Sequence, residues 1–324
     1  MWEAAMDGNS SHSSFVFRCF PELHAHRRLL ALPFFLSLLS VLLGNSALIL
    51  VIRREERLRG PMHLLICALC LVDILVVVAI LPNMLLGLTL DHSRISLAAC
   101  LTQMFFTHFL SSVESTLLLT MALDRLAAIC EPLRYRFIMD SCMLLRLLLF
   151  TLLRSGSIMA TLVALAGSLR FCGSNVIQHC YCDHMALVSL ACDSTDRSWS
   201  AGVAVIVCFV GVDIPIIFFS YVKILRVVLR AAREDRSKAF HTCSTHLMVI
   251  MCFYLVGSVA FLSRDLSSGV GAFMGVLYIL LPATVNPIIY GIRTKEIRNG
   301  LLRLLKVRTR NGSQKTSPEG RRRS

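Results

Sequence analysis

An acidic and a basic residue stand side by side at the end of a long apolar run, as Asp124 and Arg125 in the stretch MALDRLAAICEPLRY. About twenty mostly apolar residues precede them, which is the length of a membrane-spanning helix, and a basic loop follows. Charged side chains at such a place are costly unless they face protein or water. We therefore expect an acid-base pair at a membrane surface.

Two more acids, Asp73 in LCLVDIL and Glu114 in SSVEST, lie inside apolar runs. A carboxylate in such surroundings becomes neutral unless it meets a cation or hydrogen-bond donors. With Asn286 later in the chain, the two acids fit a small cation or a shared proton, or equally a protonated acid that is simply hydrogen-bonded. Asn45, which follows Gly44 in another run, is expected to hydrogen-bond a neighbouring helix and belongs to this candidate buried polar or sodium site.

The third apolar run carries His108 and three serines, Ser111, Ser112 and Ser115. The serines lie three, four and seven residues after the histidine. On a helix these spacings place the side chains on one face, where they could line a common cavity. Ordinary packing between helices is the alternative for each of them.

Cysteines gather in one long loop, RFCGSNVIQHCYCDHMALVSLACD, and occur at two earlier positions near the same side. An extracellular loop is oxidising and favours disulfides, but spacing alone cannot assign the pairs. The segment HCYCDH superficially resembles a zinc or copper site, yet a disulfide at either cysteine would remove its thiolate, so no metal is expected. The cysteines concerned are Cys19, Cys100, Cys172, Cys180, Cys182 and Cys192.

The composition is that of a membrane protein. Of 324 residues, 56% are hydrophobic and 16% are charged, against roughly 25% charged residues in soluble domains. Seven continuous apolar stretches are each long enough to cross a bilayer as a helix. The net charge of +13 comes from bases between these stretches and in the C-terminal tail, so nucleic acid is not an expected partner. The predicted spans are approximately 29–52, 62–87, 98–123, 143–166, 199–226, 241–262 and 269–292.

The short loops predict the orientation. Bases such as Arg53 and Arg54 are concentrated after the odd-numbered spans, so the N-terminus is expected outside the cell and the C-terminus in the cytoplasm. The sequon at Asn9 then lies outside and is a candidate for glycosylation, whereas the sequon at Asn311 lies inside and is expected to stay bare. Arg154, within the fourth span, can reach the membrane surface or pair inside the bundle.

The expected fold is an all-α membrane protein, a seven-transmembrane-helix bundle with a short amphipathic cytoplasmic helix after the seventh helix. Its parts are an extracellular N-terminal segment over 1–28, the seven-helix bundle over 29–292, and the amphipathic helix with a basic disordered tail over 293–324. Pro282 and Pro287 are expected to break or kink the seventh helix.

Several motifs, in their order along the chain, resemble those of rhodopsin-like G-protein-coupled receptors. They are Gly44-Asn45, Asp73 in LCLVD, Cys100, Asp124-Arg125 and Asn286-Pro287-Ile288-Ile289-Tyr290. The stretches MALDRLAAICEPLRY, PMHLLICALCLVD and KAFHTCSTHLMVIMCFY are similar to signatures of odorant receptors. CLTQMFFTHFLSSVES and SNVIQHCYCDH resemble the class I, or fish-like, branch of that family.

The resemblance implies two disulfides, Cys100 to Cys182 and Cys172 to Cys192, which leaves Cys180 with a free thiol. It also implies that a small, mostly apolar odorant binds between the helices under the cysteine-bearing loop. For that site the expected ligand-binding residues are His108, Ser111, Ser112, Ser258, Phe261 and Arg264.

The resemblance further implies a receptor in the plasma membrane whose partner is a heterotrimeric stimulatory G protein and whose output is a rise in cAMP. No cofactor and no enzymatic activity are expected. The residues expected to couple and switch are Asp124, Arg125, Tyr221, Asn286, Pro287 and Tyr290.

The chain also departs from the family's pattern. Leu123 and Leu126 stand where two tyrosines are usual around the acid-base pair, and Arg264 is displaced by one residue and followed by Asp265. A preference for carboxylate ligands is therefore not simply inherited. The alternatives are a non-olfactory chemosensory receptor on the same fold, and a seven-helix transporter or channel, for which the sequence shows no internal repeat.

Overall fold

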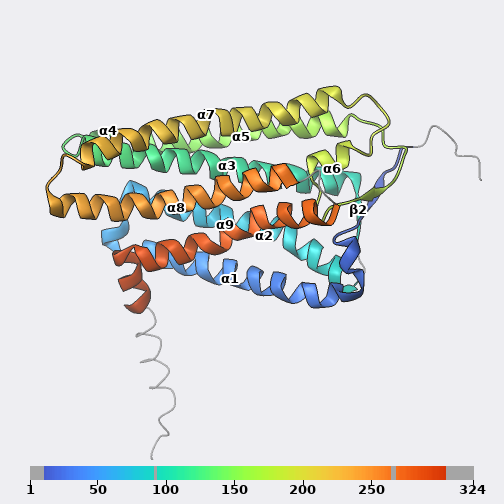
Figure 1. Ribbon diagram of the computed structural model, residues 1–324, viewed down its shortest axis with the longest axis horizontal. Helices are drawn as coiled ribbons and strands as arrows, with labels where there is room; N and C mark the ends of the chain where they lie inside the picture. Colours follow the sequence, from blue (N-terminus) through green and yellow to red (C-terminus); the bar gives the residue numbers. More distant parts are fainter. Residues whose placement is uncertain (1–10, 91–92, 264–267, 304–324) are drawn as a thin grey trace, which may run out of the picture.

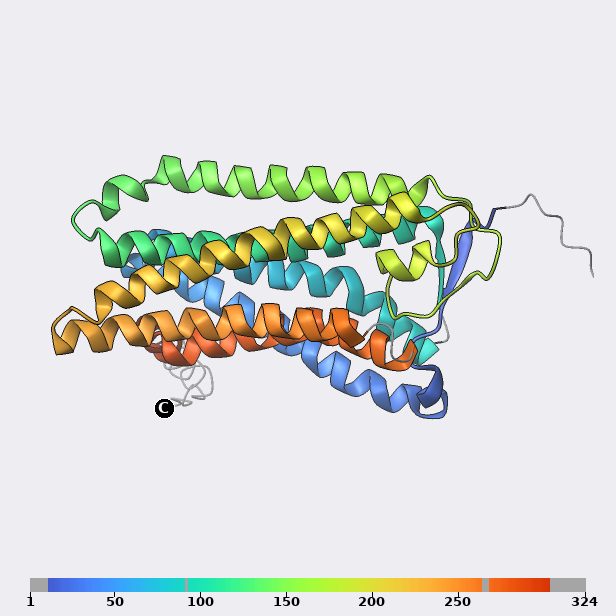
Figure 2. The ribbon, with the colours of Figure 1, turned by 45° about the horizontal axis from the view of Figure 1, so that its top comes forward.

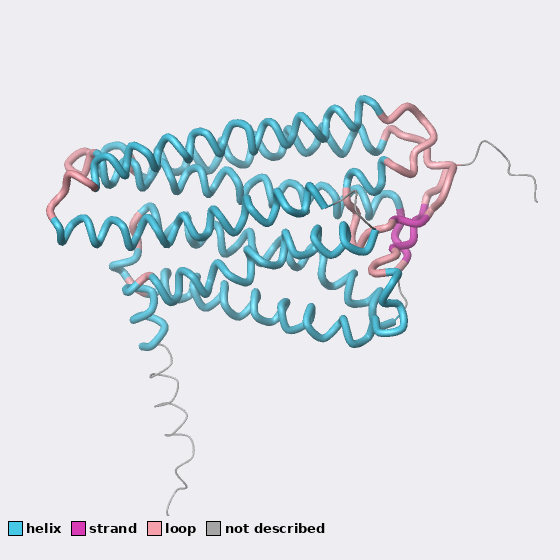
Figure 3. Tube along the Cα trace, viewed as in Figure 1, coloured by secondary structure: helices cyan, strands magenta, loops and turns pink. Residues whose placement is uncertain are grey.

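The computed structural model describes residues 11–90, 93–263 and 268–303. Within them, seven long helices lie side by side along one common direction (Figures 1 and 2). Three short strands gather at one end of the bundle (Figure 3), and the short helix α4 lies at the other. We call these ends the sheet end and the α4 end.

Each long helix covers one predicted span and extends beyond it, because hydropathy marks only the part in lipid whereas backbone hydrogen bonds continue the helix into water. The long helices are α1 (Arg27–Arg54), α2 (Pro61–Leu90), α3 (Leu97–Cys130), α5 (Ser141–Gly167), α7 (Asp196–Val228), α8 (Arg233–Ser263) and α9 (Ser268–Arg293). The short elements are β1 (Ser14–Phe17), η1 (Pro21–His26), η2 (Glu56–Leu58), β2 (Arg94–Ser96), α4 (Tyr135–Ile138), β3 (Val176–Ile177) and α6 (His184–Val188).

Helix α3 is central and contacts α2, α5, α7 and α8. By length and composition, six of the long helices could cross a membrane, and α3 is not among them. It buries polar side chains, including Gln103, Glu114 and Asp124. A helix surrounded by protein can hold such groups where lipid would not accept them, so the polarity of α3 follows from its central position.

The prolines do not break the seventh helix. Helix α9 runs through Pro282 and Pro287 without interruption, because neighbouring helices and side chains can satisfy the backbone groups that a proline frees. Pro287 also packs closely on α1, since a Cβ atom at Gly44 would lie 3.1 Å from its Cγ. Glycine at position 44 therefore lets the two helices approach.

A three-stranded sheet, in the order β2-β1-β3, covers the sheet end. β1 pairs antiparallel with β2 and parallel with β3, which joins the N-terminal segment to the α2–α3 connection and to the long loop. The all-helical prediction omitted this sheet, because strands of two to four residues leave no periodic pattern in a sequence.

Three disulfides reinforce the sheet end. Two are the pairs that the resemblance implies, Cys100–Cys182 and Cys172–Cys192. The third joins Cys19 to Cys180, whose Cα atoms lie 4.5 Å apart. The expectation of a free thiol at Cys180 is therefore wrong. The pairing of β1 with β3 brings the N-terminal cysteine to the loop, which spacing along the chain cannot reveal.

Residues 295–303 form a further helical segment after α9, at the α4 end (Figure 1). Ile297 is fully buried, and Arg303 pairs with Glu55 at 3.3 Å. The predicted amphipathic helix thus packs its apolar side on the bundle. The tail from residue 304 lies outside the described residues, as do the asparagines of both sequons, Asn9 and Asn311.

Candidate functional site

Asp124 and Arg125 form an ion pair near the α4 end of α3. The second oxygen of the Asp124 carboxylate accepts a 2.7 Å hydrogen bond from the Tyr135 hydroxyl on α4. Burial, together with this bond to Asp124, raises the pKa of Tyr135, which therefore remains a hydrogen-bond donor. Because Asp124 is fully buried, it needs such partners. If Arg125 leaves the ion pair, the hydrogen bond from Tyr135 still gives the buried Asp124 carboxylate one partner.

Helices α7 and α8 meet through Tyr221 and His246, whose hydroxyl oxygen and Nδ1 atom lie 2.6 Å apart. Tyr290 of α9 is only 1% exposed, and its hydroxyl has no hydrogen-bond partner in the described part of the chain, nor has His246 Nε2. Buried polar groups without partners are costly. Both groups would therefore gain from a rearrangement that supplies partners.

The buried acids lie around Asn286 of α9. Its amide donates to Asp73 at 3.1 Å and also faces Glu114. Asn45 of α1 donates instead to the Ala283 carbonyl at 3.0 Å, which ties α1 to α9. One oxygen each of Glu114, Asn286 and Asn45 is buried and has no hydrogen-bond partner within the described ranges. The described residues hold no cluster of three or more His, Cys, Asp or Glu arranged for a metal ion.

Arg154 of α5 and Asp213 of α7 form an ion pair inside the bundle, with 2.9 Å between Nη1 and Oδ1. Asp213 is fully buried and accepts a 2.9 Å hydrogen bond from Ser115 of α3. The Ser115 hydroxyl also lies 2.9 Å from the Tyr254 hydroxyl of α8. Removing one partner of a buried pair typically costs about 3–5 kcal/mol. This Arg154–Asp213 network therefore holds four helices in one arrangement.

Asp213 is a site residue that sequence reasoning missed. A signal was present, because an acid in the apolar stretch VCFVGVDIPIIFF requires a partner, and Arg154 is a base in another span. Pairing them requires knowing that α5 lies beside α7, which the structure shows.

Three histidines surround Asp183 at the sheet end, and we call these four residues the histidine cluster. His108 of α3 has its Nε2 atom 3.9 Å from Asp183 Oδ2, while His179 and His184 come from the long loop. Asp183 also caps α6 by accepting hydrogen bonds from two backbone N–H groups in its first turn. Helix α9 closes one side, because a Cβ atom at Gly275 would lie 2.7 Å from His179 Nε2.

Burial sets the charge of the loop residues in this cluster. Burial, with His108 nearby, lowers the pKa of His184 to about 4, and burial also lowers the pKa of His179. Burial alone would raise the pKa of Asp183, but the facing histidines and a backbone N–H outweigh it, so this pKa lies below its usual value. At neutral pH a carboxylate thus faces neutral imidazoles. One nitrogen of each of the three histidines has no hydrogen-bond partner among the described residues and could bind a polar ligand group.

The predicted serines follow His108 on α3, but each of them makes its own contacts outside the histidine cluster. Ser111 lies near Tyr278 of α9. Ser112 donates to the Phe109 carbonyl of its own helix at 2.8 Å. Ser115 belongs to the Arg154–Asp213 network. The residues that spacing places on one face of α3 therefore contact several different neighbouring helices and do not line one common cavity.

Ser258, predicted for the ligand site, lies on an exposed face of α8. Ser258 is exposed and donates to the Tyr254 carbonyl of its own helix at 2.7 Å. Leu255 and Leu262, three residues before and four after it, are also exposed, so this face of α8 is turned away from the bundle. Phe261 is 41% exposed, and Arg264 lies outside the described residues.

A bundle of seven long helices with the polar helix α3 at its centre, a covered cluster at one end and an ion pair near the other defines a multi-pass membrane receptor. Comparison with known proteins identifies the family. A family model described as "Olfactory receptor" matches residues 34–308. The chain belongs to the olfactory receptor family, and it is therefore a receptor and not an enzyme.

The similarity to curated relatives covers almost the whole chain. "Olfactory receptor 51E1" from Homo sapiens is 37% identical over 308 residues, which cover 94% of this chain and 97% of the relative. "Olfactory receptor 52D1" from Homo sapiens is 37% identical over 311 residues, covering 94% and 98%. "Olfactory receptor 51E2" from Mus musculus is 36% identical over 304 residues, covering 92% and 95%.

Proposed function

We propose that this protein binds a small volatile odorant within its helical bundle and activates a heterotrimeric stimulatory G protein, which raises cAMP. One observation carries the proposal: α3 contributes a residue to each of three buried polar sites along its length. They are His108 in the histidine cluster, Ser115 in the Arg154–Asp213 network and Asp124 in the ion pair. A ligand at one end can therefore act on the other end through one helix.

The ligand site is proposed at His108, with Ser111 and Ser112 on the same helix. A polar ligand group would bind the unpaired histidine nitrogens, and the apolar remainder would pack between the helices. Ser258, Phe261 and Arg264 remain candidates at the rim, although the exposure of Ser258 favours the α3 residues.

Activation requires two states whose balance the ligand shifts. In the proposed change, α8 moves away from α7, the Tyr221–His246 contact breaks and Arg125 leaves Asp124 to receive the G protein. The Tyr290 hydroxyl then gains a hydrogen-bond partner, which it lacks among the residues described here. Asn286 and Pro287 serve the same change on α9, and a cation or shared proton among Asn45, Asp73 and Glu114 would stabilise the resting state.

The experiment is a screen of volatile acids, alcohols and esters on cells that express the receptor, with cAMP as the readout. Arg125→Ala should abolish the evoked cAMP and leave surface expression near wild type, because the switch charge is lost and the fold is kept. Arg146→Ala, which removes an exposed base from α5, is the control and should respond normally. A full response from Arg125→Ala would refute its assigned role.

The same cells distinguish the alternatives. An odorant-evoked ion current that persists without G protein would favour a channel. Ligand-evoked cAMP together with expression confined to tissues outside the olfactory epithelium would favour a non-olfactory chemosensory receptor.

A further inference from the structure

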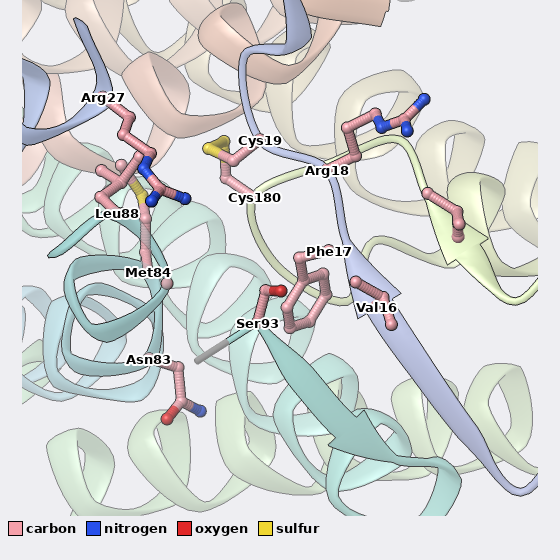
Figure 4. Close-up of a pocket in the computed structure, with 12 residues that line it drawn as sticks. Val16, Phe17, Arg18, Cys19, Arg27, Asn83, Met84, Leu88, Ser93 and Cys180 are labelled. Atoms are coloured by element: carbon pink, nitrogen blue, oxygen red, sulfur yellow. A yellow bond between two sulfur atoms is a disulfide. The ribbon is translucent and has the colours of Figure 1, made fainter. Parts of the chain in front are cut away.

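A cavity of about 230 Å³ lies at the sheet end, between β1, the last turns of α2 and the long loop (Figure 4). Its described lining includes no residue of α3, α5, α7, α8 or α9, so it is separate from the histidine cluster. We call it the sheet-end cavity.

The walls of this cavity are fixed by covalent and backbone contacts. The Cys19–Cys180 disulfide forms one wall. The Phe17 N–H donates to the Ser93 carbonyl and the Val16 N–H to the Asn175 carbonyl, both at 2.9 Å. A cavity held in this way is largely pre-formed, so little ordering is needed when a ligand enters.

The lining is cationic and apolar, and it contains no acidic residue among those described. Figure 4 shows the Arg27 guanidinium directed toward the cavity beside Met84 and Leu88, while Arg18 points away from it. Arg27 also interacts within the protein, but a guanidinium has five N–H donors and can hold a ligand oxygen as well. The volume is below the roughly 300–1,000 Å³ of sites for drug-sized ligands, which limits the occupant to a smaller molecule.

We propose that the sheet-end cavity is a second ligand site, which binds a small organic anion through Arg27 and packs its apolar part against Met84 and Leu88. This site goes beyond odorant binding between the helices. Cys180 in its wall stands between His179 and Tyr181 in the chain. An occupant therefore contacts the loop that carries the histidine cluster, and it can change odorant affinity if it binds the two receptor states differently.

The test observes Met84 directly, so it does not depend on G-protein signalling. The full-length receptor, labelled at its methionine methyl groups with ¹³C, is purified and titrated with pentanoate, and Met84→Leu assigns the Met84 resonance among 13 methionines. We expect pentanoate to shift this resonance with a Kd on the order of 1 mM. Pentanol, which has the same chain length without the charge, should shift it much less.

Matched variants locate the binding. Arg27→Gln should weaken pentanoate binding about tenfold, because a charge-assisted hydrogen bond is lost. Arg28→Gln, at the neighbouring exposed arginine, should bind normally. Leu88→Trp fills the cavity without changing charge and should abolish the shift, and unchanged resonances of the other methionines show that each variant is folded. A Met84 resonance that ignores pentanoate, or that responds equally in Arg27→Gln or to pentanol, would overturn the proposal.

Discussion

At His184, burial decides the ionisation state. The side chain is 3% exposed and lies between Asp183 and α7. Its pKa falls from 6.5 to about 4, so between these values the unfolded chain binds a proton more readily than the folded protein. The stability contributed by neutral His184 is therefore complete above about pH 6.5 and is lost as the pH falls toward 4.

We expect the purified receptor to melt at a lower temperature at pH 5.5 than at pH 7.5, with about 1 kcal/mol lost through His184. The lowered pKa of His179 acts in the same direction. His184→Gln cannot take up the proton, so its melting temperature should depend less on pH. A wild-type melting temperature that stays constant or rises on acidification would contradict this account.

Leu126 shows how a departure from the family's pattern is accommodated. It packs in an apolar cluster with Ile224, Val228 and Cys243. The Asp124 carboxylate accepts its hydrogen bond from the hydroxyl of Tyr135, which belongs to the same MALDRLAAICEPLRY stretch. The loss of the usual tyrosine therefore leaves the buried carboxylate paired, and we expect coupling to persist.

At the scale of elements, α8 is held at the α4 end from two sides. Arg293 at the end of α9 donates from Nε to Thr245 at 3.0 Å and from Nη2 to Ser244 at 2.6 Å, both on α8. On the other side, Tyr221 of α7 contacts His246. An outward movement of α8 must break both sets of contacts.

The double variant Ser244→Ala, Thr245→Val should raise basal cAMP several-fold, because hydrogen bonds to a charged group contribute about 1.5–3 kcal/mol each and both are lost only from the resting arrangement. The readout is cAMP without odorant, normalised to surface expression. Ser157→Ala is the control, because it removes a hydroxyl whose hydrogen bonds in the described structure stay within α5. Basal cAMP at the wild-type level in the double variant would show that these hydroxyls do not restrain α8.

At the scale of the whole molecule, the two ends differ in chemistry. The sheet end carries three disulfides, which persist in oxidising compartments. The α4 end carries the exposed bases Arg134, Arg136 and Arg298, which are typical of a cytoplasmic surface. Both observations support the proposed orientation, with the N-terminus outside.

This orientation predicts that cells glycosylate Asn9 and leave Asn311 bare. Treatment with a glycosidase should increase the gel mobility of the wild type, and Asn9→Gln should already migrate at the treated position. Asn311→Gln, at the other sequon, should behave as the wild type does. If Asn311→Gln loses the glycan and Asn9→Gln keeps it, the orientation is the opposite of the one proposed.

Much of the fold was predictable because its signals are local. Apolar runs of sufficient length predicted all seven long helices, and the bases between them predicted the orientation that is proposed here. The boundaries were less accurate, as at α8, which begins at Arg233 rather than near residue 241. Helices continue beyond the membrane, and hydropathy does not mark where backbone hydrogen bonding ends.

The candidate site was predictable in part. Asp124 and Arg125 are neighbours in the chain, so their pairing could be foreseen. The face of α3 at His108 also followed from helical periodicity, but the partners of its members did not. Ser258 lies on an exposed face of α8, because the rotation of a helix about its axis depends on what packs beside it.

By itself, the sequence determined the membrane-spanning helices and, through its motifs, the family. Both are encoded in residues close together along the chain. Only the tertiary structure decided that Asp213 faces Arg154, that the long loop places histidines around Asp183, and that Cys19 reaches Cys180 across 161 positions. These pairings depend on how helices and strands pack side by side, so no local pattern could have specified them.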